Sequence, residues 1–382
     1  MNEPIKTERL ISLDVFRGIT IAGMVLVNNP GTWSTIYPPL KHAPWHGCTP
    51  TDLIFPFFLF IVGVAITYSM KKRKERGDSQ RQLIMQIFRR ALILFGLGLL
   101  LATFPFYNFN TGEWLDPAKI RIPGVLQRIG VVYFISALLF LKTSMKMQIG
   151  IAAFLLLLYW ALMTLIPVPG VGYANLEATT NLAAYIDNLL LNGHLWSATK
   201  VWDPEGILST LPAIVTTLSG MFLGYWLLSD RDKMCKVIWI FVFANFTVVL
   251  GLFWDLAFPM NKNIWTSSYV LYTSGLALHF FAMCYWLIDI KGYTFWTKPF
   301  LVYGSNAITV FFLSGLLARM MSIIRWEKIP GEVITLKGYI YETFFTPFFS
   351  PLNASLGFAL FYVLLWLGIM WIFYAKKIFI KI

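Results

Sequence analysis

The sequence is poor in charged residues, cysteine and histidine. Only 13% of its 382 residues are charged, while 57% are hydrophobic. Soluble domains run nearer a quarter charged, so this composition excludes an ordinary soluble domain. Three cysteines without a CxxC spacing give neither a disulfide framework nor a metal-ligand pattern, and we expect no metal. The chain also lacks internal repeats, low-complexity segments and breaks in composition, so residues 1–382 are predicted to form a single membrane domain.

Long apolar runs dominate the chain instead. A run of about 20 apolar residues is the length that crosses the hydrocarbon core of a bilayer. Such windows fall near 11–29, 52–70, 83–104, 123–141, 147–166, 206–228, 236–257, 266–288, 298–317 and 354–375. The sequence therefore predicts an all-α integral membrane protein, a polytopic bundle of about ten transmembrane helices. The first run lacks a small-residue cleavage site, so we expect it to remain as the first helix.

The net charge of +12 would suggest nucleic-acid binding in a soluble protein, but here it follows topology. If residues 1–10 are cytoplasmic, 20 of the 31 lysines and arginines fall in cytoplasmic segments and nine in the opposite loops. Cytoplasmic loops of membrane proteins accumulate these residues, so both termini are predicted to be cytoplasmic and no nucleic acid is expected. The basic stretch 71–90 is interpreted first as a topology determinant, with phosphate binding as an alternative.

Two of the four histidines occur together at the start of a predicted span. His42 and His46 flank Trp45, and Asp52 follows just before the apolar run 53–63. An interfacial loop would explain Trp45 as a headgroup anchor and Asp52 as a favourable residue in the first helical turn. That interpretation explains neither histidine. Ionisable groups at this depth are costly and usually functional, so we predict that the chemistry occurs here.

Other ionisable residues lie where pure spans should be apolar. Asp14 and Arg17 are neighbours on one helix face, which favours a structural ion pair. Arg128 enters a helix, so it must face a carboxylate, a water-filled cavity or a ligand phosphate, and both structural and ligand roles remain open. Asp203 and Glu205 precede a helix, where capping is the default interpretation for Asp203.

The segment 261–269 collects amides, a lysine and aromatics before another helix. Asn261 and Trp265 in this segment fit sugar binding, but an interfacial turn would have the same composition.

The ordered segments resemble those of the transmembrane heparan-α-glucosaminide N-acetyltransferases and their bacterial relatives. The resemblance covers nearly the whole chain, in segments 12–18, 27–28, 41–63, 120–128, 203–208, 261–265 and 376–379. It implies transfer of an acetyl group from cytosolic acetyl-CoA to the amine of a glucosamine across the membrane. It also implies that His42 is the catalytic histidine and Asn28 the active-site asparagine. His46 is a departure, because it stands where the family carries Asn.

The residues fit this chemistry independently. Amide formation from a thioester needs a base for the amine proton, a donor for the developing oxyanion and a dry site. His42 and Asn28 can supply the first two, and Asp52 can orient an imidazole. An acetyl-histidine relay and direct transfer both remain open. The predicted site comprises catalytic His42, Asn28 and Asp52; substrate-binding Trp45, His46, Asp203, Glu205, Asn261 and Trp265; and CoA-binding Arg17 and Arg128.

Two other functions remain as alternatives. A secondary transporter for an amino sugar would also have about ten spans and buried polar residues, and an O-acyltransferase could act on an envelope sugar. We favour the acetyltransferase because the polar residues gather at one outer lip. The expected partners are the lipid bilayer, acetyl-CoA and an amino-sugar acceptor in a bacterial inner membrane, and a homodimer is a candidate assembly.

The charge asymmetry predicts which loops an impermeant thiol reagent reaches in intact cells. Single cysteines replacing Lys74 or Lys377 should be shielded, and one replacing Lys200 should be labelled, because only the last lies in the outer set. The reverse labelling pattern would overturn this topology and place the loop that contains His42 and His46, the histidine loop, on the cytoplasmic side.

Overall fold

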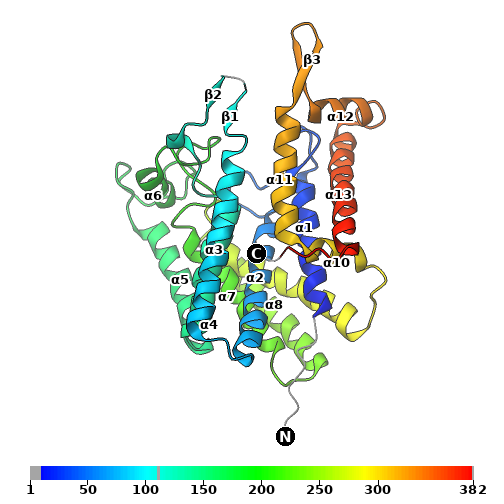
Figure 1. The fold of residues 1–382 in the computed structure, drawn as a ribbon. Helices are drawn as coiled ribbons and strands as arrows, with labels where there is room; N and C mark the ends of the chain where they lie inside the picture. The colour runs from blue at the N-terminus through cyan, green and yellow to red at the C-terminus, as the bar shows by residue number, and fades with distance from the viewer. Residues whose placement is uncertain (1–9, 110–111, 381–382) are drawn as a thin grey trace.

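The computed structural model describes residues 10–109 and 112–380. In this part of the chain, nine helices are long and apolar enough to cross a membrane, and the bent pair α10 and α11 makes a tenth span if counted as one. The predicted all-α bundle of about ten spans is confirmed. The spanning helices in Figure 1 are α1 (Ile11–Asn28), α2 (Ile54–Glu75), α3 (Gln80–Thr103), α4 (Val125–Lys142), α5 (Met145–Leu165), α7 (Thr210–Leu227), α8 (Lys233–Asp255), α9 (Ser267–Cys284), α10 (Lys298–Ser305), α11 (Ala307–Ile323) and α13 (Pro351–Ala375).

Side-chain caps set several helix starts. Ser79, Ser144 and Asp232 each accept a hydrogen bond from the backbone N–H three residues further on, at the starts of α3, α5 and α8. Such caps satisfy backbone donors that have no partner within the helix. All three caps lie in short connections that the charge pattern assigns to the cytoplasm.

The longer connections contain smaller elements that the sequence did not predict. These elements are α6 (Leu182–Leu191), α12 (Leu336–Phe344), and the antiparallel hairpins β1 (Tyr107–Asn108) with β2 (Glu113–Trp114) and β3 (Arg325–Ile329) with β4 (Glu332–Thr335). Figure 1 shows them at the upper end of the bundle, opposite the α2–α3 connection. The connections predicted to be outer loops therefore gather at one end.

Helices α2 and α7 form the centre of the bundle. In each, 67% of the most apolar stretch is buried, against 22% in the peripheral α3 and α8. The two central helices approach closely through glycines: a Cβ on Gly63 would lie 1.9 Å from Thr217 O, and one on Gly220 would lie 1.9 Å from Phe60 O. Small residues let helix backbones pack together in a membrane, where the hydrophobic effect does not drive association.

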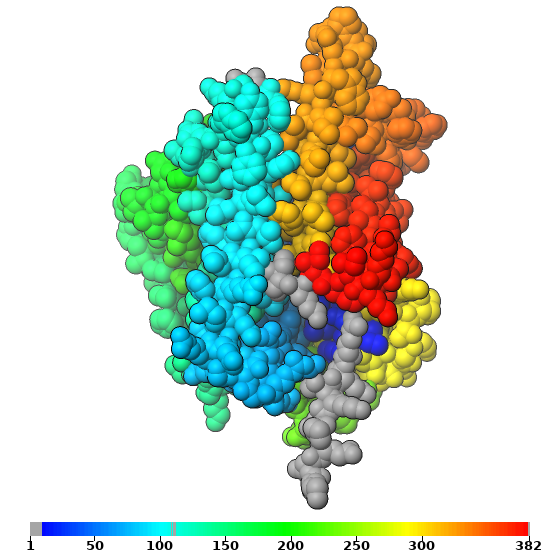
Figure 2. Space-filling view, viewed as in Figure 1, coloured from blue at the N-terminus to red at the C-terminus, as the bar shows by residue number. Residues whose placement is uncertain are grey.

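The predicted continuous span 298–317 is broken in the structure. Helices α10 and α11 meet at Asn306 with a bend of 81°. The Asn306 side chain donates to Ile378 O (3.0 Å) and accepts from the N–H of Ile380 (2.9 Å), so the segment after α13 holds the break. Figure 2 shows this red end of the chain beside the lower part of α11.

The α2–α7 contact predicts a position-specific effect of adding one methyl group. Gly220→Ala should lower the thermal midpoint of the purified protein in detergent by an amount equivalent to about 1–3 kcal/mol, because the Cβ meets a backbone carbonyl that cannot move alone. Gly150→Ala in α5 is the matched control, because nothing lies within 4 Å of that Cβ. Equal midpoints for the two variants would contradict this account of α2–α7 packing.

Candidate active site

His42 and Asp52 are in direct contact. His42 Nδ1 lies 2.5 Å from Asp52 Oδ1, and the His42 side chain is 45% exposed while Asp52 is buried. The second oxygen of Asp52 accepts the backbone N–H groups of Ala43 (3.0 Å) and Thr49 (2.9 Å). Because these bonds fix the carboxylate, we assign the His42 tautomer in which Nδ1–H donates to Asp52. Nε2 then retains the lone pair that a base or nucleophile needs.

The surrounding loop is anchored to the bundle. Asp52 belongs to η2 (Pro50–Leu53), a single 3-10 turn that leads into α2. The hydroxyl of Tyr269 in α9 donates to Asp52 O (2.5 Å), and the N–H of Gly47 donates to Met260 O (2.7 Å). Gly47 has φ +109°, a conformation that favours glycine. The local sequence therefore forms the turn, and the α8–α9 connection and α9 hold it in place.

Trp45, His46 and Cys48 lie in the same loop. Trp45 Nε1 donates to Leu176 O (2.8 Å), and its ring packs edge-on against Trp202 at 5.2 Å between centroids, so Trp45 joins this loop to the long α5–α7 connection. His46 is exposed. Burial raises the pKa of the Cys48 thiol to about 12, and the Asp52 charge acts in the same direction, so the protonated thiol is favoured at neutral pH.

The predicted substrate carboxylates Asp203 and Glu205 are both bound to Arg121. Arg121 Nε and Nη2 donate to the two oxygens of Asp203 (2.8 and 2.6 Å), and Nη2 also donates to Glu205 (2.7 Å). Burial lowers the pKa of Arg121, but these carboxylates outweigh burial and leave it above its ordinary value. The bidentate geometry fixes the start of the α7 segment, and a substrate role for the carboxylates remains a prediction.

Arg128 lies near Asp203 and Glu205 and is buried. Its Nη2 donates to Gly206 O (2.9 Å) and Ser209 Oγ (2.5 Å), and its guanidinium lies 5.3 Å from the Trp265 ring centroid. Gly206 must be small, because a Cβ there would lie 2.0 Å from Asp187 Oδ2. Burial raises the pKa of Asp187 to about 6. Arg128 therefore ties α4 to the start of α7.

Asn261 and Trp265 are fully buried. Asn261 Oδ1 accepts the backbone N–H groups of Asn263 (2.8 Å) and Ile264 (3.2 Å), and Trp265 Nε1 donates to Thr216 Oγ1 (3.1 Å). Asn261 also pairs with Gly47 of the histidine loop through a backbone bridge. These contacts support the loop from beneath, while direct contact of either side chain with a sugar remains a prediction.

Asn28 faces a cavity of about 230 Å³ between α1 and α11. Arg319 of α11 faces the same cavity. The remaining lining residues are Ile21, Met24, Val25, Asn29, Phe311, Ser314, Gly315 and Ala318. Asn28 and Arg319 thus line one cavity although they are 291 positions apart in the chain, which no sequence signal indicated.

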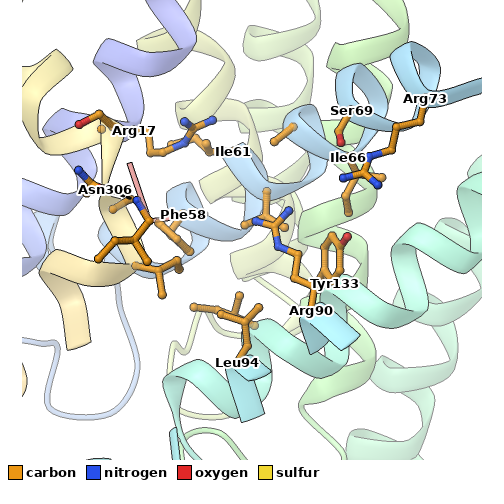
Figure 3. Close-up of a pocket in the computed structure, with 18 residues that line it drawn as sticks. Arg17, Phe58, Ile61, Ile66, Ser69, Arg73, Arg90, Leu94, Tyr133 and Asn306 are labelled. Carbon is orange, nitrogen blue, oxygen red and sulfur yellow. Dashed lines mark hydrogen bonds between the residues drawn. The ribbon is translucent and has the colours of Figure 1, made fainter. Parts of the chain in front are cut away.

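A second cavity of about 360 Å³ lies between α1, α2, α3, α4 and the α10–α11 break. Figure 3 shows Arg17, Arg73 and Arg90 around this space, together with Tyr133 and Asn306. The Arg90 guanidinium lies 4.7 Å from the Tyr133 ring centroid. No Asp or Glu is among the described residues that line this cavity. The lining favours an anionic ligand.

Arg17 and Arg128, the two arginines predicted to bind CoA, occupy different places. Arg17 lines the larger cavity and also forms the predicted ion pair with Asp14 (3.1 Å). Arg128 belongs to the cluster around Asp203. Arg73 and Arg90, from the basic stretch for which phosphate binding was the alternative interpretation, line the same cavity as Arg17. Within residues 10–109 and 112–380, no three His, Cys, Asp or Glu side chains group as metal ligands.

Comparison with known proteins identifies the family. The family model described as heparan-alpha-glucosaminide N-acetyltransferase, catalytic, matches residues 9–252. The chain is 35% identical over 357 residues to the heparan-alpha-glucosaminide N-acetyltransferase of Homo sapiens, covering 79% of this chain and 52% of the human protein. The Mus musculus protein is 33% identical over 356 residues, covering 79% and 53%. This multi-pass membrane chain, which spans about half the length of these relatives, belongs to the heparan-alpha-glucosaminide N-acetyltransferase family.

Proposed function

We propose that this chain is a membrane-bound N-acetyltransferase of the bacterial inner membrane. It moves the acetyl group of cytosolic acetyl-CoA to the amine of a glucosamine-type sugar on the opposite side. The observation that carries the proposal is the His42–Asp52 pair, 2.5 Å apart, in a loop at the far end of α1 from an arginine-lined cavity. The names of the relatives support the acyl transfer and the type of acceptor.

His42 supplies the proton chemistry in this proposal. A sugar amine must lose a proton as its nitrogen bonds to the thioester carbon. His42 Nε2 takes that proton, and Asp52 stabilises the resulting imidazolium through Nδ1–H without itself becoming protonated. The exposure of His42 lets an acceptor approach from the loop side.

The larger cavity binds the nucleotide end of acetyl-CoA. Phosphate oxygens accept bidentate hydrogen bonds from guanidinium groups, which remain charged at any physiological pH. Arg17, Arg73 and Arg90 come from three different helices and line one space. The positive charge pattern of the stretch 71–90 assigns this end of the bundle to the cytoplasm, where acetyl-CoA is available.

One face of α1 runs from the larger cavity to the smaller one. Arg17 lines the larger cavity and Asn28 the smaller one, with Ile21, Met24 and Val25 between them on the same face. At 1.5 Å per residue, eleven residues separate the two polar ends by about 16 Å. This arrangement suits a donor whose charged nucleotide and thioester are joined by a long, thin pantetheine arm.

Helix α11 lines both cavities in the same way. Ala307 and Ile308 face the larger cavity, while Phe311, Ser314, Ala318 and Arg319 face the smaller one. The spacing of three and four residues keeps all of these positions on one side of the helix. Two helices therefore flank the proposed path of the pantetheine arm from end to end.

A secondary transporter is the second candidate, favoured by the bent pair α10 and α11. Transporters place discontinuous helices at their binding sites, usually in matching positions of two halves. In the described residues there is one such bent pair, without a counterpart in the other half of the chain. A permease would bind the sugar without breaking a thioester, so release of free CoA thiol distinguishes the two functions.

His42→Ala should lower acetyl transfer to glucosamine about 10²–10⁴-fold while leaving CoA binding intact, because a general base is lost from a half-exposed position. Asn28→Ala should cost about 10²–10³-fold if its amide stabilises the oxyanion. His46→Asn is the matched control in the same loop and should be much milder. Radiolabelled transfer by purified protein measures all three rates. A near-parental rate for His42→Ala would contradict the assignment of His42 as the general base.

Arg17→Gln or Arg90→Gln should weaken CoA binding about 10–100-fold, the loss expected for hydrogen bonds to a charged group. The remaining affinity should depend less on salt, because a phosphate contact has been removed. Arg81→Gln is the control, since Arg81 is exposed in the same basic stretch and does not line the cavity. Calorimetric titration with CoA measures the affinities, and parental binding by folded Arg17→Gln and Arg90→Gln proteins would move the nucleotide site elsewhere.

A further inference from the structure

Arg319 has no role in the function proposed above. It lies four residues before the end of α11 and faces the 230 Å³ cavity opposite Asn28. Its Nη1 is shielded from solvent and has no hydrogen-bond partner in the part of the chain that the structure describes. Arg121, by contrast, is bound to two carboxylates. Arg128 also has buried nitrogens, Nε and Nη1, without a partner among the described residues, but Arg319 differs from it in lining a cavity that a ligand can occupy. A buried guanidinium nitrogen without a partner is costly in a membrane helix, and a ligand in that cavity would satisfy it.

The polar groups around this cavity divide into two kinds. Asn29 donates its amide N–H to Val25 O (2.8 Å), and the Ser314 hydroxyl donates to Phe311 O (3.2 Å), so both donors are used within their own helices. The side chain of Asn28 makes no hydrogen bond to any described residue. Asn28 and Arg319 therefore present the donors that a ligand in the cavity would meet.

The local charge favours a negative ligand group. No Asp or Glu is among the described residues that line this cavity, and Arg121, which has the same sign as Arg319, acts on it electrostatically. Asp203 and Glu205, the carboxylates near Arg121, are already hydrogen-bonded to it. A group that develops negative charge between Asn28 and Arg319 would therefore be stabilised by donors from both side chains.

We propose that Arg319, together with Asn28, binds the oxygen of the acyl group during transfer. This inference rests on the proposed function. The amine nitrogen bonds to the thioester carbon, and the C=O electron pair moves onto the oxygen, which accepts hydrogen bonds from the two side chains. When that pair returns, the C–S bond breaks and its electrons leave with the CoA sulfur. The amine proton passes to His42 and then to the thiolate, giving an amide and free CoA.

Arg319→Gln should lower kcat for acetyl transfer to glucosamine about 10²–10³-fold, the effect of removing one oxyanion donor. The KM for glucosamine and the Kd for CoA should change less than threefold, because the contact forms fully only in the transition state. Arg319→Lys keeps the charge and should recover part of the rate. Arg325→Gln is the matched control, since Arg325 is exposed in β3 and outside this cavity.

Hydrolysis of acetyl-CoA without acceptor is measured on the same proteins, because water attack passes through the same oxyanion. A parental kcat in folded Arg319→Gln would overturn the inference, and so would parallel losses of thermal stability and CoA affinity, which indicate a structural role. The unsubstituted protein can hydrolyse acetyl-CoA and yet acetylate no amino sugar. The proposed acceptor would then be wrong, but slower hydrolysis by Arg319→Gln would still support the inference. If the unsubstituted protein neither hydrolyses acetyl-CoA nor transfers its acetyl group, the proposed function and the inference are both overturned.

Discussion

Lipid offers no hydrogen bonds, so each arginine that points into a membrane bundle must be satisfied by protein, water or ligand. Two groups of arginines in the described residues illustrate different ways of meeting this requirement. Arg121 is held by Asp203 and Glu205, and it brings the segment before α4 to the start of α7. Arg73 and Arg90 instead face a cavity that no described acidic residue lines. The first arrangement stabilises the fold, and the second suits a phosphate-bearing ligand.

The two cavities are related through α1 and α11, which line both. Helix α1 packs against α10 so closely that a Cβ on Gly18 would lie 1.9 Å from Phe300 O. The break at Asn306 then turns the chain so that α11 can follow the same face of α1. A continuous helix from 298 to 323 could not make both contacts. The bend therefore positions the walls of the proposed acyl-CoA path.

Some of this structure could be predicted from the sequence because the signal is local. An apolar window of about 20 residues identifies a span wherever it packs, and His42 and Asp52 are ten positions apart in one loop. The break at Asn306 could not be predicted, since it depends on hydrogen bonds to residues more than 70 positions away. Likewise, composition could not tell whether Asp203 faces a sugar or an arginine, because its partner Arg121 is 82 positions distant.

Asn261 and Trp265 are buried, so they can support the loop that carries His42 without lying on its surface. Both residues were predicted to bind substrate, and that role stays a prediction; in the structure both are buried and hydrogen-bond to the chain itself. An acceptor approaching from outside meets the exposed His42 and His46 first. Under the proposed function, the choice of acceptor would depend on the surface of this loop, whereas the reactivity of His42 would depend on the buried residues that hold the loop in place. Substitutions at the two levels should therefore affect different kinetic parameters, with exposed positions acting on KM for the sugar and buried ones on kcat.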